Sequence, residues 1–183
     1  MKVLKWIFGI VIVCAAVVAI FLAHLGMFSA LSVSEQKMGP YVYAYEEFVG
    51  PYQKTMPVFA RVNNIIKEQG IKSDKGIGVY FDNPSQVAAD KLRSNCGAII
   101  DETDPAKLAA LSQKLKIGNF AQTNCMVVKF PIKSPLSYML APMKVYPVLS
   151  KHMNEKGYKP AESYEIYDMP NKEIYFVIPI SPR

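Results

Sequence analysis

Two halves of this chain repeat the same order of landmarks at an offset of about 85 residues, a spacing typical of internal duplication. In the first half, a strand pattern stops at Gly50-Pro51 and the helical pattern after it stops at Gly70. In the second half, Ser134-Pro135 and Gly157 stand at the corresponding places. Two strand-helix-strand-strand units predict one α+β domain, with both helices on one face of the sheet and a groove on the other face.

Residue periodicity sets the bounds of the expected elements, because strands alternate every two residues and helices bury every third or fourth. The first unit has an expected strand over 38–49, a helix carrying Val58, Val62, Ile65 and Ile66, and strands over 76–81 and 93–100. The second unit has an expected strand over 120–132, a helix carrying Leu136, Leu140, Met143, Val148 and Met153, and strands over 163–167 and 174–180. A helix near 105–115 joins the units.

An uncharged apolar run precedes the duplicated region. It extends from Trp6 to Leu22 and stays apolar to Phe28, so about 23 residues are available to cross a hydrocarbon core of about 30 Å. A cleaved signal peptide is the alternative, although its apolar region normally has about 7–15 residues and ends at spaced small residues. We therefore expect a single-pass membrane anchor over residues 1–30 and a folded domain over residues 31–183.

The charges beside this run predict its orientation. Lys2 and Lys5 are the only charged side chains close to it. Under the positive-inside rule, they hold the amino terminus in the cytoplasm and export the domain.

Composition argues against two classes of function. The net charge is +6, but no dense cluster of lysine and arginine marks a nucleic-acid partner. The chain has three cysteines and two isolated histidines, without a C-x-x-C pair, so we expect no metal site and no cofactor. Outside the apolar run, Cys96 and Cys125 are either two buried thiols or, in an oxidising compartment, a disulfide.

Strand alternation predicts which side chains face the groove. Ile77, Val79 and Phe81 form an apolar face suited to packing beneath a helix. Gly76, Gly78 and Tyr80 then face the groove. By the same alternation, Tyr164 and Ile166 point inward while Glu165 and Tyr167 face the groove opposite Gly78.

A carboxylate ringed by tyrosines suits a flat, apolar cation. The candidate ligand-binding residues are Glu165, Tyr167, Tyr80, Tyr43, Tyr45 and Gly78. Aromatic faces attract a cation within about 6 Å, and a cation would offset the cost of burying a lone carboxylate. The alternative is that the tyrosines are half-buried sheet residues and that Glu165 is an exposed strand carboxylate.

The order of these segments resembles the gyrase-inhibitor-like (GyrI-like) ligand-binding domains of bacterial multidrug-responsive regulators. The shared segments are Gly50-Pro51-Tyr52, Val79–Pro84, Tyr164–Tyr167 and Ile178–Ile180. The resemblance covers residues 38–180 and implies a pair of SHS2-type β-α-β-β units. It also implies that Glu165 is the counter-ion of a small-molecule ligand such as a lipophilic cation.

Further segments are similar to the membrane-anchored, testis-expressed type within this family, which acts as an autophagy receptor for the endoplasmic reticulum. They are the amino-terminal apolar run, Val79–Ile100 and Phe130–Leu149. This similarity implies, as an alternative, an endoplasmic reticulum membrane protein with a cytosolic domain and a protein partner. The chain ends at Arg183 without an acidic tail, so we carry over the fold and the anchor but not the autophagy role.

Three functions follow as expectations. The first is a membrane-anchored module that binds an apolar cation in the groove. The second is a membrane-tethered receptor that binds a protein partner. The third is a hydrolase of reactive electrophiles in which Glu165 acts as general base, although no catalytic triad, Cys-His pair or metal-ligand spacing accompanies it.

Overall fold

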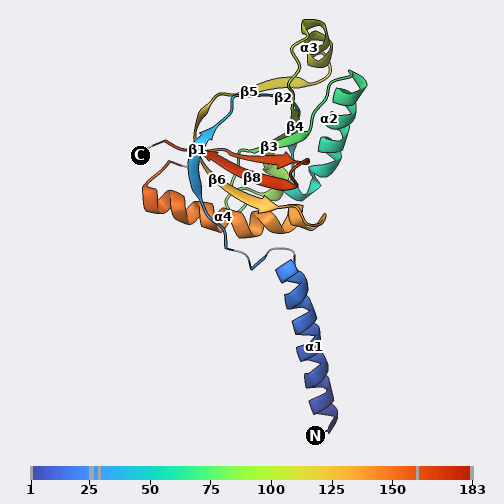
Figure 1. The fold of residues 1–183 in the computed structure, drawn as a ribbon, viewed down its shortest axis with the longest axis vertical. Helices are drawn as coiled ribbons and strands as arrows, with labels where there is room; N and C mark the ends of the chain where they lie inside the picture. The colour runs from blue at the N-terminus through green and yellow to red at the C-terminus, as the bar shows by residue number, and fades with distance from the viewer. Residues whose placement is uncertain (1, 25–26, 29, 160, 182–183) are drawn as a thin grey trace.

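The computed structural model describes every residue except 1, 25–26, 29, 160 and 182–183 (Figure 1). The chain begins with α1 (Lys2–His24), which stands apart from the folded domain. Within the described residues, Val3–Ala23 of α1 is the one segment long and apolar enough to cross a membrane, with a mean hydropathy of 2.9 and no buried residues. An anchor and a signal sequence both have these properties.

The rest of the chain folds as two units of the same order. The first unit comprises β1 (Ser34–Met38), β2 (Tyr41–Val49), α2 (Met56–Glu68), β3 (Lys75–Tyr80) and β4 (Arg93–Ile99). The second comprises β5 (Lys116–Phe120), β6 (Thr123–Pro131), α4 (Ser137–Lys156), β7 (Ser163–Asp168) and β8 (Glu173–Pro179), and α3 (Pro105–Ser112) connects them. The predicted duplication and α+β class are confirmed, whereas the short first strand of each unit, β1 and β5, was not predicted.

The eight strands found among the described residues form one curled antiparallel sheet in the order β1-β6-β8-β7-β3-β4-β2-β5. The two units meet in the middle, where β3 pairs with β7. Each short first strand pairs with the other unit, β1 with β6 and β5 with β2. The units therefore share one sheet, and each covers a strand edge of the other.

Helices α2 and α4 pack on the same face of this sheet. The buried side of α2 carries Val58, Phe59, Val62 and Ile66, as its helical spacing predicted for three of the four. Each of these helices is followed by a glycine in the left-handed region: Gly70 after α2, with φ 66°, and Gly157 after α4, with φ 69°.

The buried side of α4 differs from the predicted one. Ser137, Ala141, Val145 and Leu149 face the sheet at a spacing of four residues. The predicted core residue Met143 is 69% exposed, and Leu136 is 41% exposed. Small side chains at 137 and 141 allow the helix to lie close to the sheet, so the larger apolar residues point outward.

The other face of the sheet curls around a second apolar core. Ile77, Val79 and Ile166 lie in it, together with Tyr43 and Phe120. The prediction that Ile77 and Val79 lie beneath a helix is therefore wrong, because the curl encloses them without a helix. Phe81 lies beyond the end of β3 and is 43% exposed.

Candidate functional site

Glu165 lies on β7 directly opposite Gly78 of β3, at the junction of the two units. Its side chain faces the helices and is only 5% exposed. Strand alternation gives Tyr167 and Tyr80 the same direction, so these residues gather where α2 and α4 flank the central strands. The residues predicted to face the groove thus lie on the helix-covered face of the sheet, not on the helix-free face.

Tyrosine hydroxyls hold both oxygens of this carboxylate. Tyr167 donates to Oε2 over 2.7 Å and Tyr146 of α4 donates to Oε1 over 2.8 Å. The Tyr80 and Tyr167 hydroxyl oxygens lie 3.0 Å apart, and the Tyr146 hydroxyl lies 3.1 Å from Ser163 Oγ. Within the described residues, no lysine, arginine or histidine forms an ion pair with Glu165.

Burial dominates the acid–base behaviour of this cluster. It raises the pKa of Glu165 from its ordinary 4.5 to about 7, against the two tyrosine hydrogen bonds that favour the charged form. Burial, together with the nearby carboxylate, also raises the pKa of Tyr80, Tyr146 and Tyr167 well above 10. The tyrosines therefore stay protonated near neutral pH, while Glu165 changes between its neutral and charged forms.

Aromatic rings from several elements surround the carboxylate cluster. The Tyr80 ring packs edge-on against Tyr52, with ring centres 4.8 Å apart. The Tyr167 ring contacts Phe59 of α2 at 5.5 Å and Tyr138 of α4 at 5.8 Å. One buried carboxylate thus lies beneath an aromatic layer contributed by both helices.

Gly78 leaves room for the Tyr80 ring to lie flat along the strand. A Cβ atom at position 78 would stand 2.9 Å from both Cε2 and Oη of Tyr80. The bare backbone expected at Gly78 is therefore covered by Tyr80, and the site is filled by its own side chains. A ligand that reaches Glu165 must displace aromatic side chains.

Two of the predicted ligand residues lie elsewhere. Tyr43 and Tyr45 point into the core of the curled sheet on the face opposite Glu165, with their rings 5.4 Å apart. Bringing them to the face of Glu165 would require a one-residue shift in the register of β2. Glu165, Tyr167, Tyr80 and Gly78 are brought together as expected, and their role in ligand binding stays a prediction.

Four residues of the cluster were not predicted. Tyr138 and Tyr146 come from α4, Phe59 from α2, and Tyr52 from the 3-10 turn Tyr52–Lys54. Tyr138 and Tyr146 are eight residues apart and flank the buried stripe of their helix. Knowing which side of α4 faces the sheet would have identified both.

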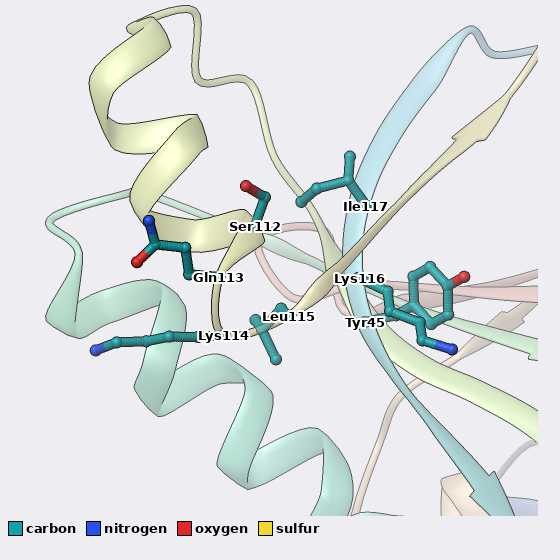
Figure 2. A pocket seen from close by; sticks show the side chains of 7 residues that line it. All are labelled: Tyr45, Ser112, Gln113, Lys114, Leu115, Lys116 and Ile117. Atoms are coloured by element: carbon teal, nitrogen blue, oxygen red, sulfur yellow. The ribbon is translucent and has the colours of Figure 1, made fainter.

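Two open hollows lie away from Glu165. The first has a volume of about 490 Å³ beside the end of α3, and Lys114, Lys116 and Tyr45 are among its walls (Figure 2). The second, about 460 Å³, includes Asp168, whose carboxylate lies 3.1 Å from Lys75 Nζ and accepts from Asn171. Within the described part of the chain, no group of three or more metal-ligating side chains is present.

Asp104 and the two buried cysteines have structural roles. Asp104 caps α3 by accepting a hydrogen bond from the Ala106 backbone N–H over 2.9 Å. Cys96 and Cys125 are buried free thiols in separate cores on opposite faces of the sheet.

Comparison with known proteins identifies relatives by sequence, although no family model matches the chain. The chain is 28% identical to the mouse testis-expressed protein 264 homolog over 88% of its length, and 27% identical to human testis-expressed protein 264 over 94%. It covers 52% and 56% of those proteins, so it spans about half the length of these curated relatives. It is also 28% identical to a DNA gyrase inhibitor of Pectobacterium carotovorum. That alignment covers 65% of this chain and 75% of the inhibitor.

Solved structures share the fold at lower identity. The C-terminal domain of EcmrR matches 84% of this chain and 99% of its own, with a TM-score of 0.56 and 12% identity. SAV2435 bound to tetraphenylphosphonium matches 82% of this chain and 94% of its own, with a TM-score of 0.56 and 15% identity. The domain therefore has the GyrI-like, effector-binding fold that its sequence motifs resemble.

Proposed function

We propose that this protein is a membrane-anchored module whose GyrI-like domain binds an apolar cation at Glu165. One observation carries the proposal: a carboxylate only 5% exposed is held by tyrosine hydroxyls and has no cationic partner in the described structure. Burying a charge without a counter-ion is unfavourable, and a cationic ligand would supply that counter-ion.

The surroundings of the carboxylate set the chemistry of the ligand. The rings of Tyr80, Tyr138 and Tyr167 supply apolar surface and aromatic faces, which favour a cation by about 0.5–2 kcal/mol each. A strongly hydrated ion such as a metal or an ammonium would lose more hydration than these rings return. The site therefore favours a cation whose charge is shielded by its own apolar groups.

The known ligand of a structural neighbour agrees with this chemistry. SAV2435 was solved with tetraphenylphosphonium, a cation whose charge lies inside four phenyl groups. Its identity to this chain is only 15%, so its ligand supports the chemical class rather than the compound.

The anchor places this binding event at a membrane. Helix α1 exposes an apolar surface along Val3–Ala23, and Lys5 lies near its amino end. We propose a single span with the amino terminus in the cytoplasm and the domain on the other side, following the positive-inside rule. Fusing a glycosylation acceptor to the carboxyl terminus tests this orientation, since modification requires a lumenal domain.

Thermal unfolding of the full chain in detergent tests the binding. Tetraphenylphosphonium at 100 times its dissociation constant should stabilise the protein by about 2.7 kcal/mol, whereas the uncharged triphenylphosphine oxide should have little effect. Glu165→Gln should abolish the stabilisation, and Glu162→Gln, which changes an exposed carboxylate just before the same strand, should retain it. Equal stabilisation of wild type and Glu165→Gln would contradict the proposal.

Hydrolysis is a second candidate function, because the pKa of Glu165 is raised to about 7. A carboxylate of that pKa is suited to general-base catalysis near neutral pH. Turnover of a strained electrophile such as an epoxide, lost in Glu165→Gln and kept in Glu162→Gln, would favour this function. Binding of the same compound without turnover would exclude hydrolysis of that compound.

A further inference from the structure

The outward side of α4 carries an apolar ridge in its first half. Met139 is 56% exposed, Met143 is 69% exposed, and Leu136 just before the helix is 41% exposed. The helix turns by about 100° per residue, so Met143 stands opposite the buried Ala141 and one turn from Met139. Residues 134–143 include no charged side chain, so no charge interrupts this ridge.

After α1, the chain enters the domain beside α4. Leu31 and Val33 pack against the core cluster formed by α4 and its strands, which includes Val145 and Leu149. Seven residue steps separate His24, the end of α1, from Leu31, and an extended chain of that length reaches at most about 25 Å. Figure 1 shows α4 as the element of the domain that lies across the end of α1.

The charge on α4 and on the residues just before it complements an anionic surface. Between Lys133 and Lys156, the chain carries four lysines and a single acidic residue, Glu155. Lys133 and Lys151 are exposed, whereas the exposed Lys156 is turned about 140° around the helix from Met143. An exposed apolar ridge with basic neighbours is typical of helices that lie in the interface of a membrane containing anionic lipid.

We propose that the outward ridge of α4 docks on the lipid surface of the membrane that α1 spans. The docking rests on the anchoring proposed above. The short connection holds the ridge at a high effective concentration next to the bilayer, so a weak contact suffices. Leu136, Met139 and Met143 enter the boundary between headgroups and acyl chains, and the lysines remain at the headgroups.

Docking would bring one wall of the Glu165 site to the bilayer. Tyr138 and Tyr146 lie on the same helix as the ridge, and Tyr146 donates a hydrogen bond to Glu165. An apolar cation concentrates at an anionic membrane surface. It could then reach the aromatic cluster from the lipid side of α4, and a displacement of the helix would accompany its entry.

Fluorescence of the full chain in vesicles tests the docking. An environment-sensitive fluorophore is attached to Met143→Cys, with Ala109→Cys on α3 as control, because Figure 1 shows α3 at the end of the domain farthest from α1. Both variants also carry Cys14→Ala, which removes the exposed native cysteine. Because Cys96 and Cys125 are buried, the fluorophore then reacts at the introduced thiol. The vesicles contain phosphatidylcholine alone or with phosphatidylserine, and lipids carrying a nitroxide serve as quenchers. Resistance of the protein to carbonate extraction reports the anchoring separately.

The expected result is a blue shift and strong quenching at position 143, increased by phosphatidylserine, with neither at position 109. Adding Met139→Glu to the 143 label should reverse both changes while leaving thermal stability unchanged, because Met139 is exposed. Carbonate-resistant protein whose 143 label stays in water would overturn the docking and leave the anchoring intact. If carbonate extracts the protein from the vesicles, both the docking and the anchoring are overturned. That result would not bear on cation binding. If the blue shift depends on the protein-to-lipid ratio and the nitroxide lipids do not quench the label, the ridge contacts a second copy of the protein. That result would overturn docking on lipid.

Discussion

Replacing Glu165 by glutamine should make the protein more stable at neutral pH, although it removes two charge-assisted hydrogen bonds. Burial raises the pKa of Glu165 from 4.5 to about 7, so the folded protein binds a proton that the unfolded chain has lost between these values. Each unit of difference between the folded and unfolded pKa values is worth about 1.4 kcal/mol. Above pH 7 the charged carboxylate therefore lowers the free energy of unfolding by about 3 kcal/mol.

The sign of the pH dependence follows from the direction of this shift. Below about pH 4.5 the carboxyl of Glu165 is protonated in both states and has no effect on the pH dependence. As pH rises from 4.5 to 7, the unfolded chain ionises first, so the free energy of unfolding falls. Above pH 7 both states are ionised, and the loss of stability is complete.

Glutamine removes this loss but satisfies the cluster less well. Its carbonyl can accept from Tyr146 or Tyr167, while its amide group must find an acceptor among the same hydroxyls. An imperfect hydrogen bond costs about 1 kcal/mol. We therefore expect Glu165→Gln to gain about 2 kcal/mol at pH 8 and to lose up to about 1 kcal/mol at pH 5.

Urea denaturation of the full chain in detergent, followed by the near-ultraviolet circular dichroism of the tyrosines, measures this difference. Wild type, Glu165→Gln and the exposed-site control Glu162→Gln are compared from pH 5 to pH 8. The control should track the wild type within about 0.5 kcal/mol. A stability difference between wild type and Glu165→Gln that is the same at pH 5 and pH 8 would refute the raised pKa of Glu165.

Three further predictions concern the ligand and the packing. The dissociation constant for tetraphenylphosphonium should rise about tenfold per pH unit below 7, because only ionised Glu165 pairs with it, and titration calorimetry showing a pH-independent constant would contradict this. Gly97→Ala should cost about 3 kcal/mol or more, since its methyl group would lie 2.1 Å from the Ala44 carbonyl oxygen of the paired strand, and a variant with wild-type urea midpoint would refute that contact. Leu149→Ala should cost about 3 kcal/mol by leaving a cavity under α4, with the exposed Ser150→Ala as control, and equal melting temperatures of the two would contradict the packing of α4.

The order of elements was predictable from sequence because each long element has a clear period and a clear stop. Glycine and proline end the patterns, and the structure places helix and strand boundaries close to them. The strands β1 and β5 were not predicted because Ser34–Met38 and Lys116–Phe120 have only five residues each and show no alternation of apolar and polar residues. They become strands by pairing with the other unit, which no local pattern reveals.

The side of the sheet that the helices cover was predicted wrongly for a physical reason. Alternation correctly grouped Gly78, Tyr80, Glu165 and Tyr167 on one face, but hydrophobicity assigned the helices to the face of Ile77. An open sheet has one apolar face under its helices. A curled sheet buries its inner face as well, so the more apolar face of β3 lies inside the curl.

The difference between the two units at their junction explains why the site has a single carboxylate. β3 and β7 are equivalent strands of the duplicated units and pair with each other, so Gly78 and Glu165 are equivalent positions that face each other. A glutamate at both positions would place two carboxylates in adjacent strands, about 5 Å apart at Cβ, where they would repel each other or share a proton. Glycine in one unit removes that repulsion and gives the Tyr80 ring the space in which it covers the strand. The duplication supplies the symmetric frame, and the asymmetry at this one pair supplies a lone acid that a single cation can neutralise.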